Sequence, residues 1–149
     1  MAEAPQEYEV EIAANIDGCI EVLTDFEQYP VWSSPILEAK ILTQHPDGRA
    51  HHVGFALDMR IRTLRYTLAY EYDLPSQISW SLLEGDLTNV SGSYRLEGTP
   101  QGHVIATCRQ EIDLGFWVPG AIRRMAERQA LRDSVLEFKT QAEQKHGLA

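Results

Sequence analysis

The chain has 149 residues, a formal charge of −9 at neutral pH and a pI near 4.9. This acidic balance argues against nucleic acid as a partner, because phosphate backbones require a basic protein face. The length fits one domain, residues 1–149, which is large enough to bury a core without disulfides or metal. Cys19 and Cys108 lie far apart without C-x-x-C spacing, so we expect two reduced thiols.

The start of the sequence and its hydropathy favour a cytoplasmic location. Residues 1–5 lack the basic beginning and the apolar segment of a signal peptide. No uncharged apolar run approaches the roughly 20 residues that span a bilayer. We therefore expect a soluble cytoplasmic protein, either a monomer or a weak homodimer.

The first part of the chain predicts a strand and then a short helix. Residues 7–12 alternate acidic and apolar side chains, which is typical of a strand with one face in water. Asn15 or Asp17 can cap a helix in which Ile20 and Leu23 have helical spacing. This strand and helix would begin the fold.

Prolines shape the next segment. Pro30 is expected to end the first helix, and Pro30 and Pro35 bracket Trp32, which rules out one continuous helix. We expect a broken helical turn that carries Trp32 toward the mouth of the sheet. A second strand over residues 37–44 should follow, and then a turn at residues 46–48 in which glycine takes a positive φ.

Residues 49–114 predict a long run of antiparallel strands, because apolar residues recur there at every second position. The face that we assign to the interior is rich in large aromatic side chains. One interpretation is an ordinary packed core; the other is a cavity for an apolar or aromatic small molecule. Buried tyrosine hydroxyls favour the second, since each costs about 1–3 kcal/mol if left unpaired. The predicted ligand-binding residues are Trp32, Phe55, Met59, Tyr66, Tyr70, Trp80, Tyr94, Gln110, Phe116 and Met125.

The last segment, residues 119–146, changes to a helical pattern. A stripe of apolar residues in its second half should dock on the sheet; it consists of Leu131, Val135, Phe138 and Ala142. Ile122, Met125 and Ala126 fall roughly on the opposite side of the helix. Either a neighbouring loop covers Ile122, or the first turns form part of a gated entrance. The order of elements predicts an α+β fold in which a curved sheet buries its inner face against this helix.

Several motifs give the chain a resemblance to the polyketide cyclase/dehydrase family of the START-like superfamily, which also holds the birch-pollen-allergen proteins. The motifs are Phe26-x-x-Tyr29-Pro30-x-Trp32, residues 66–72, Trp80-Ser81-Leu82, Glu84-Gly85-Asp86, residues 92–96, and Pro119-Gly120 before a helix that ends in Ala142-Glu143. The resemblance implies the helix-grip fold. In that fold a seven-stranded antiparallel sheet wraps around a long C-terminal helix, two short helices follow strand one, and a cavity lies between.

The resemblance also implies a function, because members of this superfamily bind lipids, quinones, hormones or polyketides. We expect this chain to bind a hydrophobic, aromatic or polycyclic small molecule. One alternative is an aromatic polyketide cyclase or dehydratase that uses the same cavity. A second alternative is an accessory carrier of lipid or quinone.

The sequence leaves catalysis open. Cyclisation or water loss needs a general acid or base near the substrate. By strand parity Asp58, Arg60, Arg95 and Arg109 point outward, and inward tyrosine or glutamine side chains are weak bases. The G-x-S-x-G elbow, the P-loop and the G-x-G-x-x-G fingerprint do not occur. We therefore assign no catalytic residue.

We expect neither a metal site nor a cofactor. His45 and His103 lie beside turns, and His146 lies in the tail. His51 and His52 are adjacent in a strand, so their side chains should leave opposite faces and could not share one metal.

Basic residues cluster against the acidic average on the last helix. Arg123, Arg124, Arg128 and Arg132 supply four of the thirteen basic residues. Such side chains are commonly solvated or paired with neighbours such as Glu127. The alternative is a dock for an anion, namely a phosphopantetheine, an acidic partner or a lipid headgroup.

Overall fold

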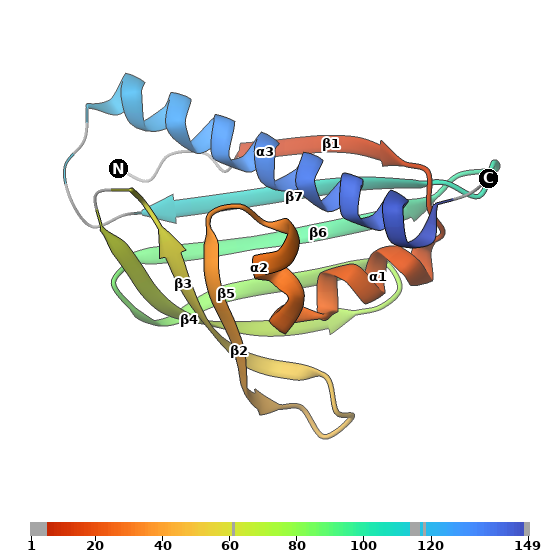
Figure 1. Ribbon diagram of the computed structural model, residues 1–149, viewed down its shortest axis with the longest axis horizontal. Coiled ribbons are helices and arrows are strands. Elements are labelled where there is room, and N and C mark those ends of the chain that lie inside the picture. The colour runs from red at the N-terminus through yellow and green to blue at the C-terminus, as the bar shows by residue number, and fades with distance from the viewer. Residues whose placement is uncertain (1–5, 61, 114–116, 118, 148–149) are drawn as a thin grey trace.

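The computed structural model describes residues 6–60, 62–113, 117 and 119–147 (Figure 1). Phe116, which we predicted to contact ligand, lies outside these residues. The elements in chain order are β1 (Gln6–Ile12), α1 (Ile16–Thr24), the 3-10 turn η1 (Phe26–Gln28), α2 (Tyr29–Trp32), β2 (Ile36–Gln44), β3 (Ala50–Asp58), β4 (Thr63–Asp73), β5 (Gln77–Gly85), β6 (Asn89–Gly98), β7 (Val104–Asp113) and α3 (Gly120–His146).

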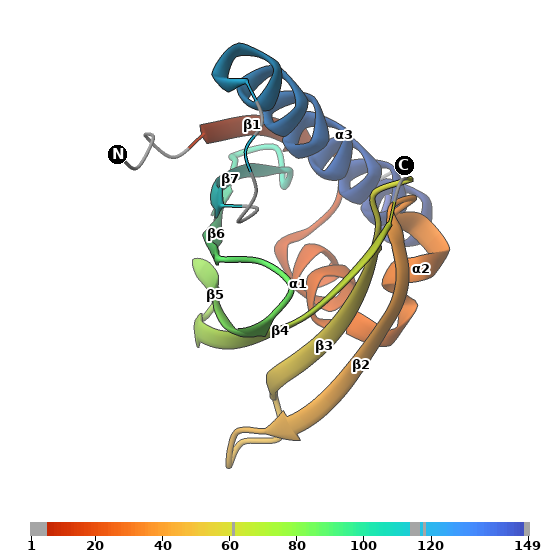
Figure 2. The same ribbon diagram turned by 90° about the vertical axis from the view of Figure 1, so that its left-hand side faces the viewer.

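The described strands form one seven-stranded antiparallel sheet in the order β1-β7-β6-β5-β4-β3-β2. Consecutive strands from β2 to β7 are neighbours, and β1 adds to the free edge of β7. Figure 2 shows the sheet curling around α1, while α3 crosses the open side of the curve. The α+β class and the helix-grip architecture predicted from the sequence are confirmed.

The core lies between the concave face of the sheet and the two longer helices. The predicted stripe on α3 is confirmed, because Val135, Phe138 and Ala142 are fully buried and Leu131 is nearly so. From the other side the core receives alternate residues of the strands, such as Ile12 of β1. Side chains on one face recur about every 3.6 residues in the helix and every second residue in the strands, so each element has an apolar face, and these faces pack together.

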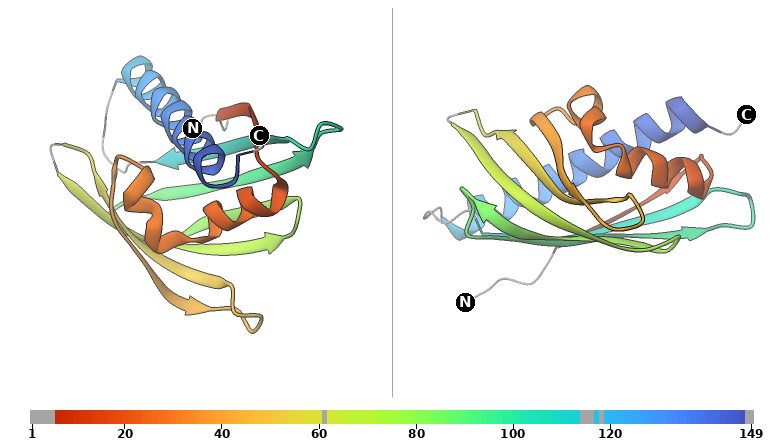
Figure 3. Two further views of the ribbon diagram at one scale, coloured as in Figure 1. Left: turned by 45° about the vertical axis from the view of Figure 1, so that its right-hand side comes forward. Right: turned by 90° about the horizontal axis from the view of Figure 1, so that it is seen from below.

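Polar contacts fix the C-terminal end of α3 beside the link between β1 and α1. The Glu143 carboxylate accepts hydrogen bonds from the Ala13 amide at 2.8 Å and from Lys139 Nζ at 2.6 Å. Lys139 Nζ also donates to the Glu11 carbonyl at 2.8 Å. Ala14 and Gly147 form an isolated antiparallel β-bridge. Figure 3 shows this end of α3 close to α1.

The structure corrects the expected end of the first helix. Helix α1 ends at Thr24 rather than at Pro30, and Pro30 lies in the first turn of α2. Proline is tolerated there because first-turn amides have no partner within the helix. Of the two candidate caps, Asn15 is the one used: its Oδ1 accepts a hydrogen bond from the Gly18 amide at 2.6 Å.

The first half of α3 differs from the second in burial. Between Gly120 and Ala130 no described side chain is buried. Ile122 is 60% exposed and Met125 is 69% exposed, so neither is covered by a described loop. Hydrophobic packing therefore stabilises the second half of the helix much more than the first.

This asymmetry predicts a gradient of hydrogen exchange along α3. Amides of residues 122–126 should exchange faster than those of residues 135–138, because few buried apolar contacts oppose local opening of the first turns. Exchange measured by NMR or mass spectrometry tests this. Uniform protection along the helix would contradict it.

Candidate functional site: the aromatic interior

Seven aromatic rings form a closed circuit on the concave side of the sheet. Neighbouring ring centroids lie 4.5–6.3 Å apart, within the range of favourable aromatic contacts. In order, the members of this aromatic circuit are Phe26, Tyr70, Trp80, Tyr94, Phe138, Trp32 and Tyr29, which returns to Phe26. The rings come from three neighbouring strands, from α3, and from the segment of η1 and α2.

Strand register places three of these rings side by side. Tyr70 of β4 is the direct cross-strand partner of Trp80 in β5, and Trp80 in turn faces Gly92 of β6. A Cβ atom at Gly92 would lie only 2.6 Å from Cζ2 of Trp80. The indole therefore occupies space that any other residue at position 92 would fill.

Two further rings extend the circuit toward β3. Phe55 stacks on Tyr66 at 5.6 Å with an interplanar angle of 25°, and its centroid is 6.5 Å from that of Tyr70. Phe55 also lies 6.0 Å from Tyr29. The inner face of the sheet is thus continuous aromatic surface from β3 to β6.

The structure brings most of the predicted ligand-binding residues together. Phe55, Tyr70 and Tyr94 are buried in the core. The half-buried residues that pack against this core are Trp32, Met59, Tyr66 and Trp80. Gln110 is half-buried and pairs with Gly92 across β6 and β7. Met125 is exposed and is not part of the aromatic wall.

Sequence reasoning missed three members of the circuit. Phe26, Tyr29 and Phe138 are not among the predicted ligand-binding residues, although Phe138 belongs to the predicted stripe on α3. The spacing Phe26-x-x-Tyr29-x-x-Trp32 carried the signal, because residues three apart face the same side of a helical segment. Only the packing shows that these rings face those of the sheet.

The polar atoms of this interior are mainly tyrosine hydroxyls. The Tyr29 hydroxyl donates a hydrogen bond to the Leu23 carbonyl at 2.6 Å. Within the described residues the hydroxyls of Tyr66 and Tyr70 make no hydrogen bond. Burial raises the pKa of both hydroxyls above the ordinary value, and neighbouring tyrosines add to the effect at Tyr70. Both side chains are therefore neutral hydrogen-bond donors at physiological pH.

The Tyr94 hydroxyl and the Cys108 thiol are further polar groups in the interior. Burial raises the pKa of Tyr94 well above its ordinary value and that of the Cys108 thiol to about 12. Burial also raises the pKa of the Cys19 thiol to about 11. Both cysteines are free, as expected, and as buried thiols they are poor nucleophiles.

The predicted geometry of the histidine pair is wrong. The rings of His51 and His52 lie 4.1 Å apart with an interplanar angle of 32°, so they share one side of the sheet. The pairing of Thr43 with His52 and of Gln44 with Ala50 leaves His51 as an extra residue in β3. Such a β-bulge breaks the alternation of side chains on which the prediction rested.

Two clefts open on the outside of the fold. One, of about 500 Å³, lies between α2 and α3 and borders Trp32. The other, of about 540 Å³, lies along β2, β3, β4 and β5, and its lining includes Phe55 and Tyr66 together with charged residues such as Lys40 and Arg65. Within the described residues, no helix has the length and the apolar character needed to cross a membrane.

Comparison with known proteins places the chain in a family. The model of the family described as "Polyketide cyclase / dehydrase and lipid transport" matches residues 21–139. The chain belongs to this family. The matched segment runs from α1 to the second half of α3 and so includes all seven rings of the aromatic circuit. Among curated proteins, no sequence gives a significant match.

Solved structures agree with this assignment at the level of the fold. A START superfamily protein from Mycobacterium smegmatis has a TM-score of 0.88 and 21% identity over 96% of this chain and 99% of that one. The Zhui aromatase/cyclase from Streptomyces sp. R1128 has a TM-score of 0.78 and 21% identity over 95% and 94%. A STAR-related lipid transfer protein fragment from Xanthomonas axonopodis has a TM-score of 0.70 and 14% identity over 92% and 84%.

The contact between Trp80 and Gly92 can be tested with two substitutions in the same strand. Gly92→Ala should lower the free energy of unfolding by about 1–3 kcal/mol and shift tryptophan fluorescence, because the new methyl group would lie 2.6 Å from both the Arg109 carbonyl oxygen and the Trp80 indole. Gly98→Ala is the control, since a Cβ there has no neighbour within 4 Å. The control should be neutral or up to about 1 kcal/mol more stable. Equal effects of the two substitutions in chemical denaturation would contradict this account.

Proposed function

We propose that this protein binds a hydrophobic, aromatic or polycyclic small molecule of the lipid, quinone or polyketide type between the sheet and α3. The observation that carries the proposal is a pair of neutral tyrosine hydroxyls, on Tyr66 and Tyr70, that have no described protein partner on an otherwise aromatic wall. An aromatic wall recognises rings, and a few placed donors fix their orientation.

The state of the hydroxyls defines the polar part of the ligand. A protonated phenol donates a hydrogen bond, so its natural partner is an oxygen acceptor such as a ketone or quinone carbonyl. A hydrogen bond of this kind contributes about 0.5–1.5 kcal/mol, so a carbonyl oxygen that accepts from Tyr70 stabilises the complex. The ligand that best fits this wall is therefore a ring system that carries carbonyl oxygens.

A second candidate is a polyketide cyclase or dehydratase that uses the same interior. It is supported by the family match and by the similarity to the Streptomyces aromatase/cyclase. In this alternative Tyr66 and Tyr70 would donate hydrogen bonds to carbonyl oxygens of a folded substrate and stabilise an enolate. Their raised pKa values make them unsuitable as general bases, so the proton acceptor would have to be another group.

The start of α3 is proposed to contact an anionic lipid surface, as a carrier of lipid or quinone would. Arg123, Arg124 and Arg128 lie in the half of α3 without buried side chains. Trp117, 85% exposed, lies just before this half, and the exposed side chains of Ile122 and Met125 lie within it. Exposed apolar residues among arginines are typical of segments that bind at a membrane interface.

Tyr70 and Tyr72 provide a matched pair for testing the ligand proposal. The two residues are two positions apart in β4, so they belong to the same face of the strand. The Tyr72 hydroxyl, however, donates a hydrogen bond to the Ala50 carbonyl at 2.7 Å. Tyr70→Phe should weaken binding of 1-tetralone by about 3–10-fold and leave binding of tetralin, the hydrocarbon of the same shape, unchanged. Tyr72→Phe should lower the free energy of unfolding by about 1 kcal/mol without affecting either affinity. Titration calorimetry and thermal unfolding give both readouts. Equal affinities of the two variants for 1-tetralone would show that the Tyr70 hydroxyl does not donate a hydrogen bond to the ligand.

Charge reversal tests the lipid surface. Arg124→Glu with Arg128→Glu should weaken binding to phosphatidylglycerol vesicles, and more strongly at low salt, where screening is weak. The stability should change little, because exposed ion pairs contribute about 0–1 kcal/mol. Arg95→Glu with Arg109→Glu, on exposed positions of β6 and β7, changes the net charge equally and should retain binding. Equal loss in both double variants would show a general charge effect, and a large drop in melting temperature would show a structural role.

A further inference from the structure

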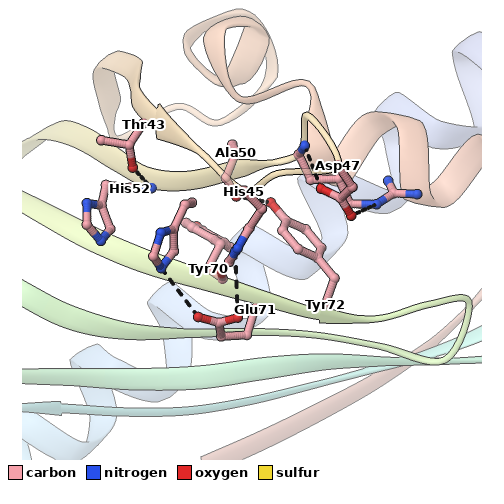
Figure 4. A network of polar contacts seen from close by, with 10 residues as sticks. Thr43, His45, Asp47, Ala50, His52, Tyr70, Glu71 and Tyr72 are labelled. Atoms are coloured by element: carbon pink, nitrogen blue, oxygen red, sulfur yellow. Dashed lines mark hydrogen bonds and ion pairs between the residues drawn. The ribbon is translucent and has the colours of Figure 1, made fainter.

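Two imidazoles face one carboxylate where the β2–β3 hairpin meets β4. His45 Nε2 lies 3.6 Å from one oxygen of Glu71, and His51 Nε2 lies 3.4 Å from the other. The two imidazole rings are 4.1 Å apart, centroid to centroid. One ligand atom from each of the three residues falls within 4.8 Å of the other two. Figure 4 shows Glu71 directed toward His45.

These separations fit a divalent metal ion. In a tetrahedral zinc site with bonds of about 2.0–2.1 Å, ligand atoms lie about 3.4 Å from one another. Each imidazole nitrogen lies close to that distance from one oxygen of Glu71, although the two nitrogens approach different oxygens, and one ligand atom from each of the three residues lies within 4.8 Å of the others. Two imidazoles and one carboxylate are also an established zinc ligand set, in which the fourth position is left to water. Glu71 is 65% exposed, so water can reach that position.

The local backbone holds the histidines in place before any ion arrives. The His45 amide donates to the Arg49 carbonyl at 2.8 Å, and the Gly48 amide donates to the His45 carbonyl at 2.9 Å, which closes the turn between β2 and β3. The bulge at His51 directs this ring toward His45, whereas regular alternation would have turned it away. The hydrogen bond from Tyr72 to Ala50 fixes the hairpin against β4. The two histidines are therefore held near each other by the hairpin before an ion binds.

The arrangement differs from other contacts between histidine and glutamate in the described part of the chain. His103 Nδ1 lies 2.7 Å from Glu11, and His146 Nε2 lies 2.9 Å from Glu21. Each of those carboxylates faces one imidazole, which makes an ordinary ion pair. Only the group of His45, His51 and Glu71 meets the distance criterion for three metal ligands among the described residues.

We propose that His45, His51 and Glu71 bind one Zn²⁺ ion, which ties the β2–β3 hairpin to β4 on the outer side of the sheet. His45 Nε2 also lies 2.7 Å from the Tyr70 carbonyl oxygen. When this nitrogen carries a proton it donates to that carbonyl. Zinc binding replaces the hydrogen bond with a bond from Nε2 to the metal, and the neutral imidazole then carries its proton on Nδ1. A proton is released to solvent only when the imidazole is doubly protonated before zinc binds. The same residue, Tyr70, directs its ring into the aromatic circuit, so the site adjoins the proposed ligand wall from the opposite side.

Zinc titration of the full chain tests the proposal. Competition with a chromogenic chelator should show one saturable Zn²⁺ site per chain, and Co²⁺ should give the visible absorption of a site with nitrogen and oxygen ligands. His51→Asn and Glu71→Gln should each weaken binding by at least about tenfold, since even residues that only support ligands change affinity 10–100-fold. His103→Asn is the matched control and should retain the affinity of the wild type. Zinc should raise the melting temperature of the wild type and of this control, but not of the two ligand variants.

Several outcomes would overturn the proposal. They are the absence of saturable binding at one ion per chain, equal weakening by His103→Asn, or unchanged affinity in His51→Asn and Glu71→Gln. Circular dichroism without metal establishes that each variant is folded. If a ligand variant does not fold, the wild type decides: zinc should shift the imidazole ¹⁵N resonances of His45 and His51 and leave those of His103 unmoved. None of these results depends on whether a ligand binds the aromatic interior.

Discussion

The packing of Phe138 against the concave face of the sheet is the contact on which the rest of this structure depends. Its side chain is fully buried, and its ring meets both Tyr94 of β6 and Trp32 of α2. Burying a phenylalanine contributes about 1.5–3 kcal/mol, and aromatic contacts add to this. Without Phe138 the aromatic circuit would be open on the side of α3, and the helix would lose the centre of its stripe. The last element of the chain thus closes the aromatic circuit.

The interior that results is unusual for a packed core because it combines rings with hydroxyl groups. A core built only for stability would prefer leucine, isoleucine and phenylalanine, which bring no polar atoms. Here Tyr70 and Tyr94 are buried, and desolvation keeps both hydroxyls protonated. The family to which the chain belongs is described by polyketide cyclisation, dehydration and lipid transport, all of which involve large hydrophobic molecules. A wall of rings with neutral donors suits molecules of that class.

The outer side of the sheet is organised by a different constraint, the bulge in β3. By adding one residue between the pairs of β2 and β3, it turns His51 toward His45 and toward Glu71. Tyr70 and Glu71 are neighbours in β4 but serve opposite faces, one in the aromatic circuit and one beside the imidazoles. A strand with one buried and one wet face can carry two independent sites in this way.

The sequence by itself determined the fold class and most of the inner face. Strict alternation in the central strands assigned Phe55, Tyr70 and Tyr94 to the interior, and helical spacing identified Leu131, Val135, Phe138 and Ala142 as the docking stripe; all of these are buried. Periodicity sufficed because burial of one face repeats along each regular element. Only the tertiary structure showed the contacts between distant residues, the helix boundary at Pro30 and the bulge in β3. It brought Phe26 and Tyr29 onto rings of distant strands, placed Pro30 inside a new helix, and used a bulge to bring His51 beside His45. Each of these features depends on long-range packing or on a break in regular strand or helix geometry. Neither cause produces a regular spacing of apolar residues that could be recognised in the sequence.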